Sequence, residues 1–190
     1  MKEIFILGGP NGAGKTTVSR ILLREVLHLR FFLNADEIAR QLSPVDSDAT
    51  ALRAGRLMIE RMRELVRTGQ SFAFETTCSG KSYLRMLREC QLAGWRVSLL
   101  FLWLPSADEC IRRVRQRVRS GGHGIPEDVI RRRYEAGIYN MRDFYLPLAD
   151  SARIYDNSER TQRLVAEKDL TGQLVINDET VWSKIREVAQ

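Results

Sequence analysis

Short apolar runs alternate along this chain with longer stretches in which apolar residues recur at helical spacing. The short runs predict strands at 3–8, 30–34, 71–75, 96–104 and 152–156. The run at 96–104 is almost unbroken in its apolarity, so we expect that strand to be buried on both faces, at the centre of the sheet. Strands that alternate with helices predict an α/β fold with a doubly wound, mostly parallel five-stranded sheet flanked by helices.

Two of the helical stretches are defined well enough to predict a face that packs on the sheet. In the first, apolar residues recur at helical spacing from Leu52 to Val66. In the second, the predicted core positions are Ile111, Val114 and Val118. The second stretch follows Ser-Ala-Asp-Glu at 106–109, a capping-box sequence that marks the start of a helix.

The pattern changes after residue 156. Residues 163–168 and 173–177 predict a small β-hairpin with Gly172 at its turn, and a terminal helix is expected from Asp178. We interpret about 160–190 as an appendage at the edge of the sheet. The chain has 190 residues, a length that suits one domain over 1–190.

Charge changes the picture more than overall composition does. The formal net charge is +6, and the segment 112–133 holds eight arginines against two acids, Glu127 and Asp128. A compact cluster of arginines favours a polyphosphate ligand, because guanidinium groups bond phosphate oxygens two at a time. Proteins that bind nucleic acid usually spread their cations along one face, so the charge pattern disfavours a nucleic-acid partner.

The cysteines and the N-terminal apolar run exclude two further classes. The cysteines, Cys78, Cys90 and Cys110, lack the spacing of a zinc site or a redox pair, so we expect reduced core thiols. The apolar run at 4–7 stops at two glycines and is too short for a signal segment or a membrane span. We therefore expect a cytoplasmic protein without a membrane partner.

A phosphate-binding motif follows the first predicted strand. Residues 9–16 match G-x-x-x-x-G-K-[ST], and a helical pattern comes next. Its glycines let backbone N–H groups approach a phosphate, and the helix N-terminus adds a favourable dipole. We expect Lys15 to reach the β- and γ-phosphates and Thr16 to bind Mg²⁺. The residues expected to bind ATP or GTP are Gly9, Pro10, Asn11, Gly12, Ala13, Gly14, Lys15, Thr16 and Thr17.

Two acids lie at the ends of other predicted strands, where ligands bind in doubly wound sheets. Asp36 is a candidate base for a hydroxyl acceptor, with the first turn or the cap of a helix as its structural alternative. Glu75 is a candidate for orienting the acceptor, with an acid paired to an arginine as the alternative. Thr76, Thr77 and Ser79 follow it and either donate to an acceptor or form a local turn.

The arginine-rich segment predicts a helix, a glycine-rich turn at 121–124 and a new helix from Pro126. We interpret 112–133 as a lid that brings cationic charge to the transferring phosphoryl group. The alternative is an ordinary solvated basic face. The arginines are interpreted as lacking compensating acids at i+4, which favours phosphate contact.

Taken together, the motifs resemble those of the zeta-toxin-like P-loop kinases, in particular their short single-domain members. The resemblance spans nearly the whole chain. The motifs that carry it are Gly-Gly-Pro-Asn-Gly-Ala-Gly-Lys-Thr-Thr at 8–17, Asn-Ala-Asp-Glu-Ile at 34–38, Phe-Glu-Thr-Thr at 74–77, Ser-Gly at 79–80, Gly-Gly-His-Gly-Ile-Pro at 121–126, Arg-Tyr at 133–134 and Tyr-Asp-Asn-Ser at 155–158.

The resemblance implies ATP or GTP as donor and a sugar hydroxyl of UDP-N-acetylglucosamine as acceptor. By the same match Asp36 takes the place of the catalytic base, Arg117 that of a lid arginine, and Asn157 lies where the adenine ring rests. The residues expected to bind the acceptor are Glu75, Thr76, Thr77, His123 and Arg133. At 77–79 this chain has Thr-Cys-Ser where the founding toxins carry a further arginine, and His123 stands where they have a second lid arginine.

Three functions remain open from the sequence. The first is a small-molecule kinase that uses Asp36 as base. The second is a nucleotide-dependent switch or partner-binding module without an acceptor, and the third is a nucleic-acid end kinase. The paired strand-end acids favour the first, because a switch needs no acceptor base, and an antitoxin partner stays open.

Overall fold

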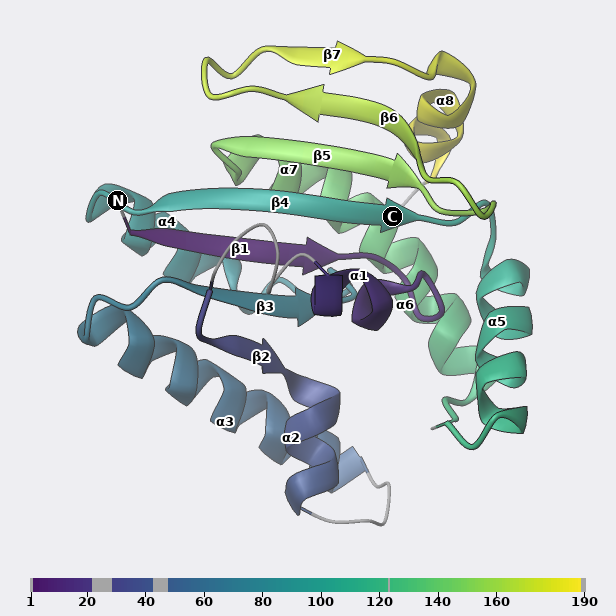
Figure 1. The fold of residues 1–190 in the computed structure, drawn as a ribbon, viewed down its shortest axis with the longest axis horizontal. Helices are drawn as coiled ribbons and strands as arrows, with labels where there is room; N and C mark the ends of the chain where they lie inside the picture. The colour runs from purple at the N-terminus through teal and green to yellow at the C-terminus, as the bar shows by residue number, and fades with distance from the viewer. Residues whose placement is uncertain (1, 22–28, 43–47, 123, 189–190) are drawn as a thin grey trace.

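A seven-stranded sheet forms the middle of the molecule in the computed structural model, which describes residues 2–21, 29–42, 48–122 and 124–188 (Figure 1). Its strand order is β2-β3-β1-β4-β5-β6-β7. The strands are β1 (Glu3–Gly8), β2 (Phe32–Asn34), β3 (Phe72–Thr76), β4 (Arg96–Trp103), β5 (Ser151–Asp156), β6 (Arg163–Lys168) and β7 (Leu174–Ile176). The first five are parallel, which confirms the predicted α/β class.

The predicted C-terminal hairpin belongs to this same sheet. β6 pairs with β5 in antiparallel fashion and β7 pairs with β6, so the hairpin extends the sheet beyond its five parallel strands. Gly172 lies at the turn with φ of +87°, a left-handed conformation that glycine adopts without strain. The helix α8 (Glu179–Glu187) follows, and the side chain of Asp178 caps it by accepting from the N–H of Val181.

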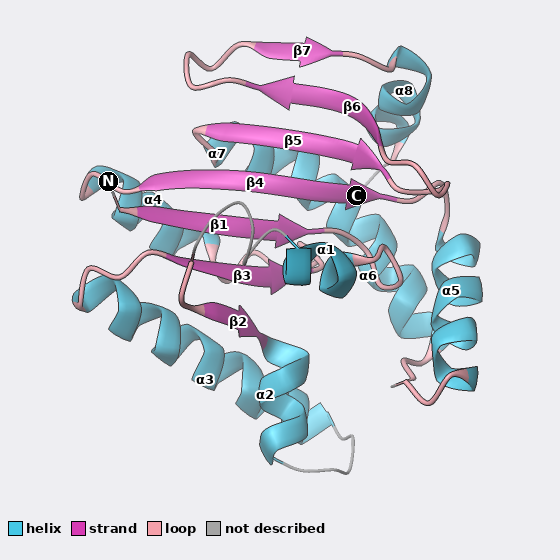
Figure 2. Cartoon of the chain, viewed as in Figure 1, coloured by secondary structure: helices cyan, strands magenta, loops and turns pink. Residues whose placement is uncertain are grey.

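Helices cover both faces of the sheet. They are α1 (Lys15–Ile21), α2 (Ala35–Leu42), α3 (Asp48–Arg67), α4 (Leu84–Leu92), α5 (Ala107–Arg119), α6 (Glu127–Asn140), the π-helical turn η2 (Met141–Tyr145) and α7 (Leu146–Leu148). In Figure 2, α1 lies in front of the sheet, and α4, α6 and α7 lie behind it. Among the described residues, no helix combines the length and the apolarity needed to cross a lipid bilayer.

The core forms where these layers meet. Every residue of β4 after Arg96 is buried, and β4 is the middle strand of the seven, as its apolar run predicts. Two predicted core positions are wrong. Leu52 is 68% exposed, because it lies on the side of α3 opposite the buried stripe of Ala54, Met58 and Met62. Val118 is 44% exposed and lies in the last turn of α5.

Candidate functional site

The phosphate-binding loop connects β1 to α1 at the edge where the parallel strands end (Figure 1). Gly9 has φ of +145°, and a Cβ there would lie 2.5 Å from the carbonyl oxygen of Leu102 on β4. Gly14 has φ of +83°, and a Cβ there would lie 2.9 Å from Nδ2 of Asn157. The loop is therefore shaped as a cradle that only glycine permits at these two points.

The side chain of Lys15 bonds the backbone of this loop. This side chain is 6% exposed, and Nζ donates to the carbonyl oxygens of Gly9 at 2.7 Å and Pro10 at 2.9 Å. The same nitrogen lies 3.6 Å from Oε1 of Glu75, at the end of β3. The ammonium therefore joins the phosphate-binding loop to the neighbouring strand end.

The remaining predicted nucleotide-binding residues surround this cradle. Thr16 and Thr17 are exposed in the first turn of α1, directly after the loop. Asn157 follows β5, and its Nδ2 donates to the carbonyl oxygen of Ala13 at 2.7 Å. Asn11 is buried, and its Oδ1 has no hydrogen-bond partner in the described part of the chain.

Asn34 organises the two strand-end acids, a role that the sequence interpretation missed. Its Nδ2 donates to Oε2 of Glu75 at 3.0 Å across the β2–β3 pair. Its Oδ1 accepts from the N–H of Asp36 at 2.8 Å and from that of Glu37 at 3.4 Å, so Asn34 caps α2. An asparagine directly before a helical pattern is a signal that could have revealed this cap.

Asp36 therefore lies in the first turn of α2 but is not its cap. Its carboxylate is exposed and makes no hydrogen bond or ion pair with any residue that the structure describes. Glu75 differs, because its side chain is 12% exposed and already bonded to Asn34 and close to Lys15. Burial raises the pKa of Glu75, the charge of Lys15 opposes that rise, and the charge of Asp36 adds to it.

A cavity of about 200 Å³ lies between these groups. The predicted site residues that line it are Lys15, Asp36, Glu75, Thr76, Thr77 and Arg133. Ser79, which the sequence analysis named together with Thr76 and Thr77, and Asn11, which it assigned to the nucleotide, also line the cavity. So do Asn34, Ser82 and Tyr83, which it did not assign. We call this space the acceptor cavity.

The loop at 77–80, which we call the acceptor loop, forms one wall of this cavity and is held from behind by α6 and η2. Nδ2 of Asn140 donates to the carbonyl oxygens of Cys78 and Ser79, each at 3.0 Å. The hydroxyl of Tyr145 donates to the carbonyl oxygen of Gly80 at 2.7 Å. Cys78 has φ of +59°, which is uncommon for a residue other than glycine and is costly unless the surroundings enforce it.

The arginine-rich segment is more neutral than its sequence suggests. Arg112 and Arg113 both pair with Glu109, which lies just outside the segment, while Arg115 pairs with Glu127 and Arg131 pairs with Asp108. Hydrogen bonds from Arg112, and then from Arg113, lower the pKa of Glu109 to about 2. The prediction that these arginines lack compensating acids is therefore wrong for these four, because helix packing and neighbouring turns supply the acids.

Arg117 and His123 also belong to the predicted lid segment. Arg117 lies in the last turn of α5 and does not line the acceptor cavity. His123 lies outside the described residues. Gly121 follows α5 in a turn with φ of +81°, and α6 begins after Pro126 with acids in its first turn.

The cysteines are buried and free, as predicted. Burial raises the pKa of the Cys78 and Cys110 thiols to about 12, so they stay protonated near neutral pH.

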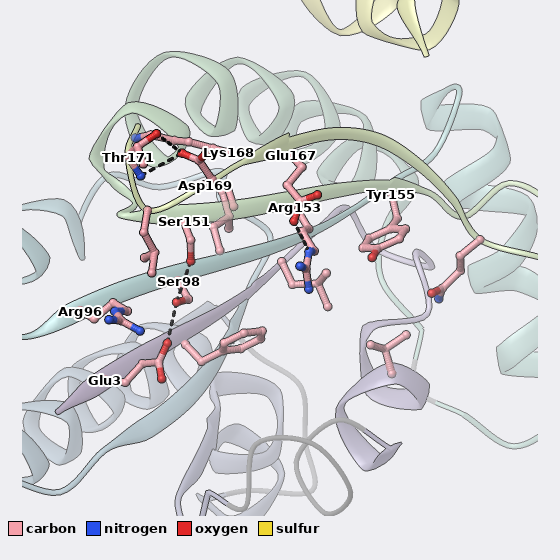
Figure 3. A pocket seen from close by; sticks show the side chains of 17 residues that line it. Glu3, Arg96, Ser98, Ser151, Arg153, Tyr155, Glu167, Lys168, Asp169 and Thr171 are labelled. Atoms are coloured by element: carbon pink, nitrogen blue, oxygen red, sulfur yellow. Dashed lines mark hydrogen bonds and ion pairs between the residues drawn. The ribbon is translucent and has the colours of Figure 1, made fainter. Parts of the chain in front are cut away.

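A larger hollow of about 770 Å³ lies over β1, β4, β5 and β6, away from the phosphate-binding loop. Figure 3 shows that its polar groups are bonded to one another: Ser98 donates to Glu3, and Arg153 pairs with Glu167. The acceptor cavity is smaller, but it alone adjoins Lys15 and the strand-end acids. Chemistry rather than size therefore marks the site.

Comparison with known families agrees with this geometry. The AAA domain family matches residues 4–144. The chain belongs to this family. This AAA domain protein is 30% identical to an uncharacterised protein of Haemophilus influenzae over 133 residues. The aligned region covers 70% of this chain and 92% of the Haemophilus protein.

Solved structures show the same fold at low identity. The structure of AvrRxo1-ORF1:-ORF2 with ATP superposes with a TM-score of 0.75 at 17% identity, covering all of this AAA domain chain and 65% of that one. A structure from the PezAT toxin–antitoxin system of Streptococcus pneumoniae gives 0.65 at 17% identity, covering 99% and 78%. Shikimate kinase from Bacteroides thetaiotaomicron gives 0.52 at 17% identity, covering 97% and 94%. The AAA domain chain has a P-loop kinase-like fold.

Proposed function

We propose that this chain is a kinase that transfers the γ-phosphate of ATP or GTP to a hydroxyl group of a small molecule. The carboxylate of Asp36 carries the proposal. It shares the acceptor cavity with Lys15 and Glu75, and it has no hydrogen bond to the described residues. Asn34 already caps α2, so capping does not account for Asp36, whereas a place in the first turn of α2, the other structural alternative, is what the structure has. The position of Asp36 in the acceptor cavity is what favours a kinase over a nucleotide-binding switch or partner-binding module without turnover.

The nucleotide fits the loop on structural grounds. The positive φ angles of Gly9, Gly12 and Gly14 and the lack of room for a Cβ at Gly9 and Gly14 make a cradle for phosphates. Residues 9–17 would hold the phosphates, Asn157 would lie beside the base, and Thr16 would bind Mg²⁺ together with phosphate oxygens. When bound, the nucleotide supplies the γ-phosphoryl group and Mg²⁺ offsets its charge.

Each residue of the cavity has its own role in the proposed reaction. Asp36 accepts the proton that the acceptor hydroxyl loses as its oxygen bonds to phosphorus. Glu75, Thr76 and Thr77 orient the acceptor, and Lys15 offsets charge on the transferring group. Arg117 contributes further cationic charge from a lid over 112–133 in this proposal.

The resemblance to zeta-toxin-like kinases makes a nucleotide sugar such as UDP-N-acetylglucosamine the first acceptor to test. Structural similarity to a protein of a toxin–antitoxin system supports an antitoxin as a partner to test as well. We include a cytoplasmic location in the proposal, because ATP is the donor.

The proposal is tested by acceptor-dependent release of ADP, with phosphorus NMR on each acceptor that responds. Asp36→Asn keeps the size of the side chain but removes the proton acceptor, so turnover should fall by roughly 10²- to 10⁴-fold while ATP affinity persists. Glu37→Gln is the matched control, because Glu37 is an exposed acid in the same turn and does not line the cavity.

Two results would contradict the proposal. A folded Asp36→Asn protein that keeps most of its turnover would remove Asp36 from the mechanism. ATP binding without transfer to any acceptor would favour the switch.

A further inference from the structure

Four charged side chains line the acceptor cavity, and two of them, of opposite charge, lie close to each other. Lys15 and Glu75 lie 3.6 Å apart, and each also bonds other protein groups. The other two are Asp36 and Arg133, which form no ion pair with each other and no hydrogen bond with any described residue. The cavity therefore presents a carboxylate and a guanidinium whose hydrogen-bonding capacity is not used by the described protein.

Arg133 differs in this respect from the arginines near it. It lies on α6 and is half-buried, whereas Arg131, two residues earlier, is exposed and pairs with Asp108. A half-buried guanidinium loses hydration without gaining a partner, which is unfavourable unless an anion binds there. Since Asp36 suits a hydroxyl that must lose a proton, Arg133 suits a second, anionic part of the same acceptor.

The size of the cavity limits the rest of the acceptor. Its volume of about 200 Å³ is below the roughly 300–1,000 Å³ of pockets that enclose drug-sized ligands. The hydroxyl-bearing residues Thr76, Thr77, Ser79, Ser82 and Tyr83 line it. Thr77 and Ser79 bond each other, Thr76 accepts from the N–H of Cys78, and Tyr83 donates to Met58. Each of these bonds leaves part of the hydroxyl's capacity for a ligand. Hydroxyl groups that both donate and accept suit a small polyol.

Arg133 and the acceptor loop are parts of one supported unit. The helix that carries Arg133 also carries Gly137, where a Cβ would lie 2.5 Å from the carbonyl oxygen of Thr77, and Asn140, which bonds Cys78 and Ser79. Such close packing of helix against loop leaves little freedom to widen the cavity between them. The cavity thus keeps its small size while holding a cation at its wall.

We propose that the acceptor cavity recognises a monosaccharide-sized polyol unit together with an attached anionic group, which Arg133 binds, and that it does not recognise a nucleoside beyond that group. This inference rests on the proposed kinase function. It assigns to Arg133 the discrimination between charged and neutral acceptors. The anion can be a phosphate, a carboxylate or the diphosphate of a nucleotide sugar, and the test separates these sources.

The test compares phosphate transfer to matched acceptors. The series are N-acetylglucosamine, its 1-phosphate and UDP-N-acetylglucosamine; glucose and glucose 1-phosphate; and glycerol and glycerate. Where a series is phosphorylated, kcat/KM should be about 10- to 100-fold higher for the anionic members than for the neutral one, the range expected for a hydrogen-bonded charge. The kcat/KM for N-acetylglucosamine 1-phosphate should be similar to that for UDP-N-acetylglucosamine.

Arg133→Ala should remove this preference, chiefly by raising the acceptor KM, while the KM for ATP stays within a few-fold. Arg133→Lys should restore part of it, because it keeps the charge without the two-pronged geometry. Arg132→Ala controls for the loss of one arginine from the proposed lid, since Arg132 is an exposed neighbour that does not line the cavity, and it should leave the preference for anionic acceptors unchanged. The same variants titrated with N-acetylglucosamine 1-phosphate by calorimetry give a readout that does not depend on turnover.

Each contrary result has a distinct meaning. Equal or better transfer to neutral acceptors, or a strict need for the uridine, would overturn this inference and leave the kinase standing. A rise in the KM for ATP alone in Arg133→Ala would assign Arg133 to the nucleotide and overturn it as well. Transfer to no acceptor, in a protein that binds ATP, would overturn the kinase proposal and this inference with it.

Discussion

The phosphate-binding loop and the acceptor loop follow neighbouring parallel strands and meet at the same cavity, yet they are held in place differently. The first has most of its restraints within its own residues: glycines with positive φ, and Lys15 bonded to Gly9 and Pro10 only six and five residues away, with one remote hydrogen bond from Asn157 to Ala13. The second has no glycine at its left-handed position, which is Cys78, and is held by Asn140 and Tyr145, 62 and 65 residues further along the chain.

The difference suggests that local contacts shape the loop that binds phosphates, and remote contacts shape the loop that recognises the acceptor. A loop held by its own backbone can bind the constant part of the substrates, the phosphates, in any protein that has the motif. A loop held by a distant helix takes its shape from that helix, so changes in α6 can alter acceptor recognition without touching the phosphates. Three substitutions test this division.

The largest effect should come from the local loop. Lys15→Ala should weaken ATP binding by roughly 10- to 100-fold, because the phosphates lose a charged contact. The substitution also leaves Glu75 buried without its cation, so Lys15→Ala with Glu75→Gln serves as a second variant free of that charge. Calorimetry with ATP and thermal unfolding on both proteins are the measurements, and unchanged ATP affinity in a folded variant would contradict the assignment.

An intermediate effect should come from the remote support. Asn140→Ala removes the donor to Cys78 and Ser79, and we expect the acceptor KM to rise by about 10-fold with kcat and the KM for ATP nearly unchanged. Gln91→Ala is the matched control, because its amide likewise bonds a distant carbonyl oxygen, that of Leu148, but far from the cavity.

Both variants should unfold at lower temperature than the parent, so stability alone does not separate them. A similar acceptor KM for Asn140→Ala and Gln91→Ala, measured with the best acceptor of the series above, would show that Asn140 has only a structural role. A parallel rise in the KM for ATP would show that the two loops are not independent.

The smallest effect should come from Tyr145→Phe. The change removes one hydrogen bond, to the carbonyl oxygen of Gly80, and keeps the packing of the ring, so stability should fall by about 0.5–1.5 kcal/mol. We expect the acceptor KM to change by only a few-fold, since Asn140 still holds the middle of the loop. Denaturant unfolding checks the first expectation, and an acceptor KM shifted as far as in Asn140→Ala would contradict the second.

Strands, caps and the phosphate-binding loop could be predicted because each depends on residues close together in the sequence. The strand at β4 follows from its continuous apolar run, and the cap of α5 from Ser106 and Glu109, which bond as the sequence indicates. Charge was less predictable. Arg131 pairs with Asp108 across the α5–α6 turn, a contact that a count of charges within one segment does not reveal.

The sequence by itself determined the α/β fold, the cradle at 9–16 and the position of Asp36 and Glu75 at strand ends, because backbone preference and side-chain periodicity act over a few residues. The tertiary structure alone decided that Asn34 bonds Glu75 across the β2–β3 pair, that α6 holds the acceptor loop, and that Arg131 pairs with Asp108. These contacts join residues that the path of the whole chain brings together, and no local pattern encodes that path.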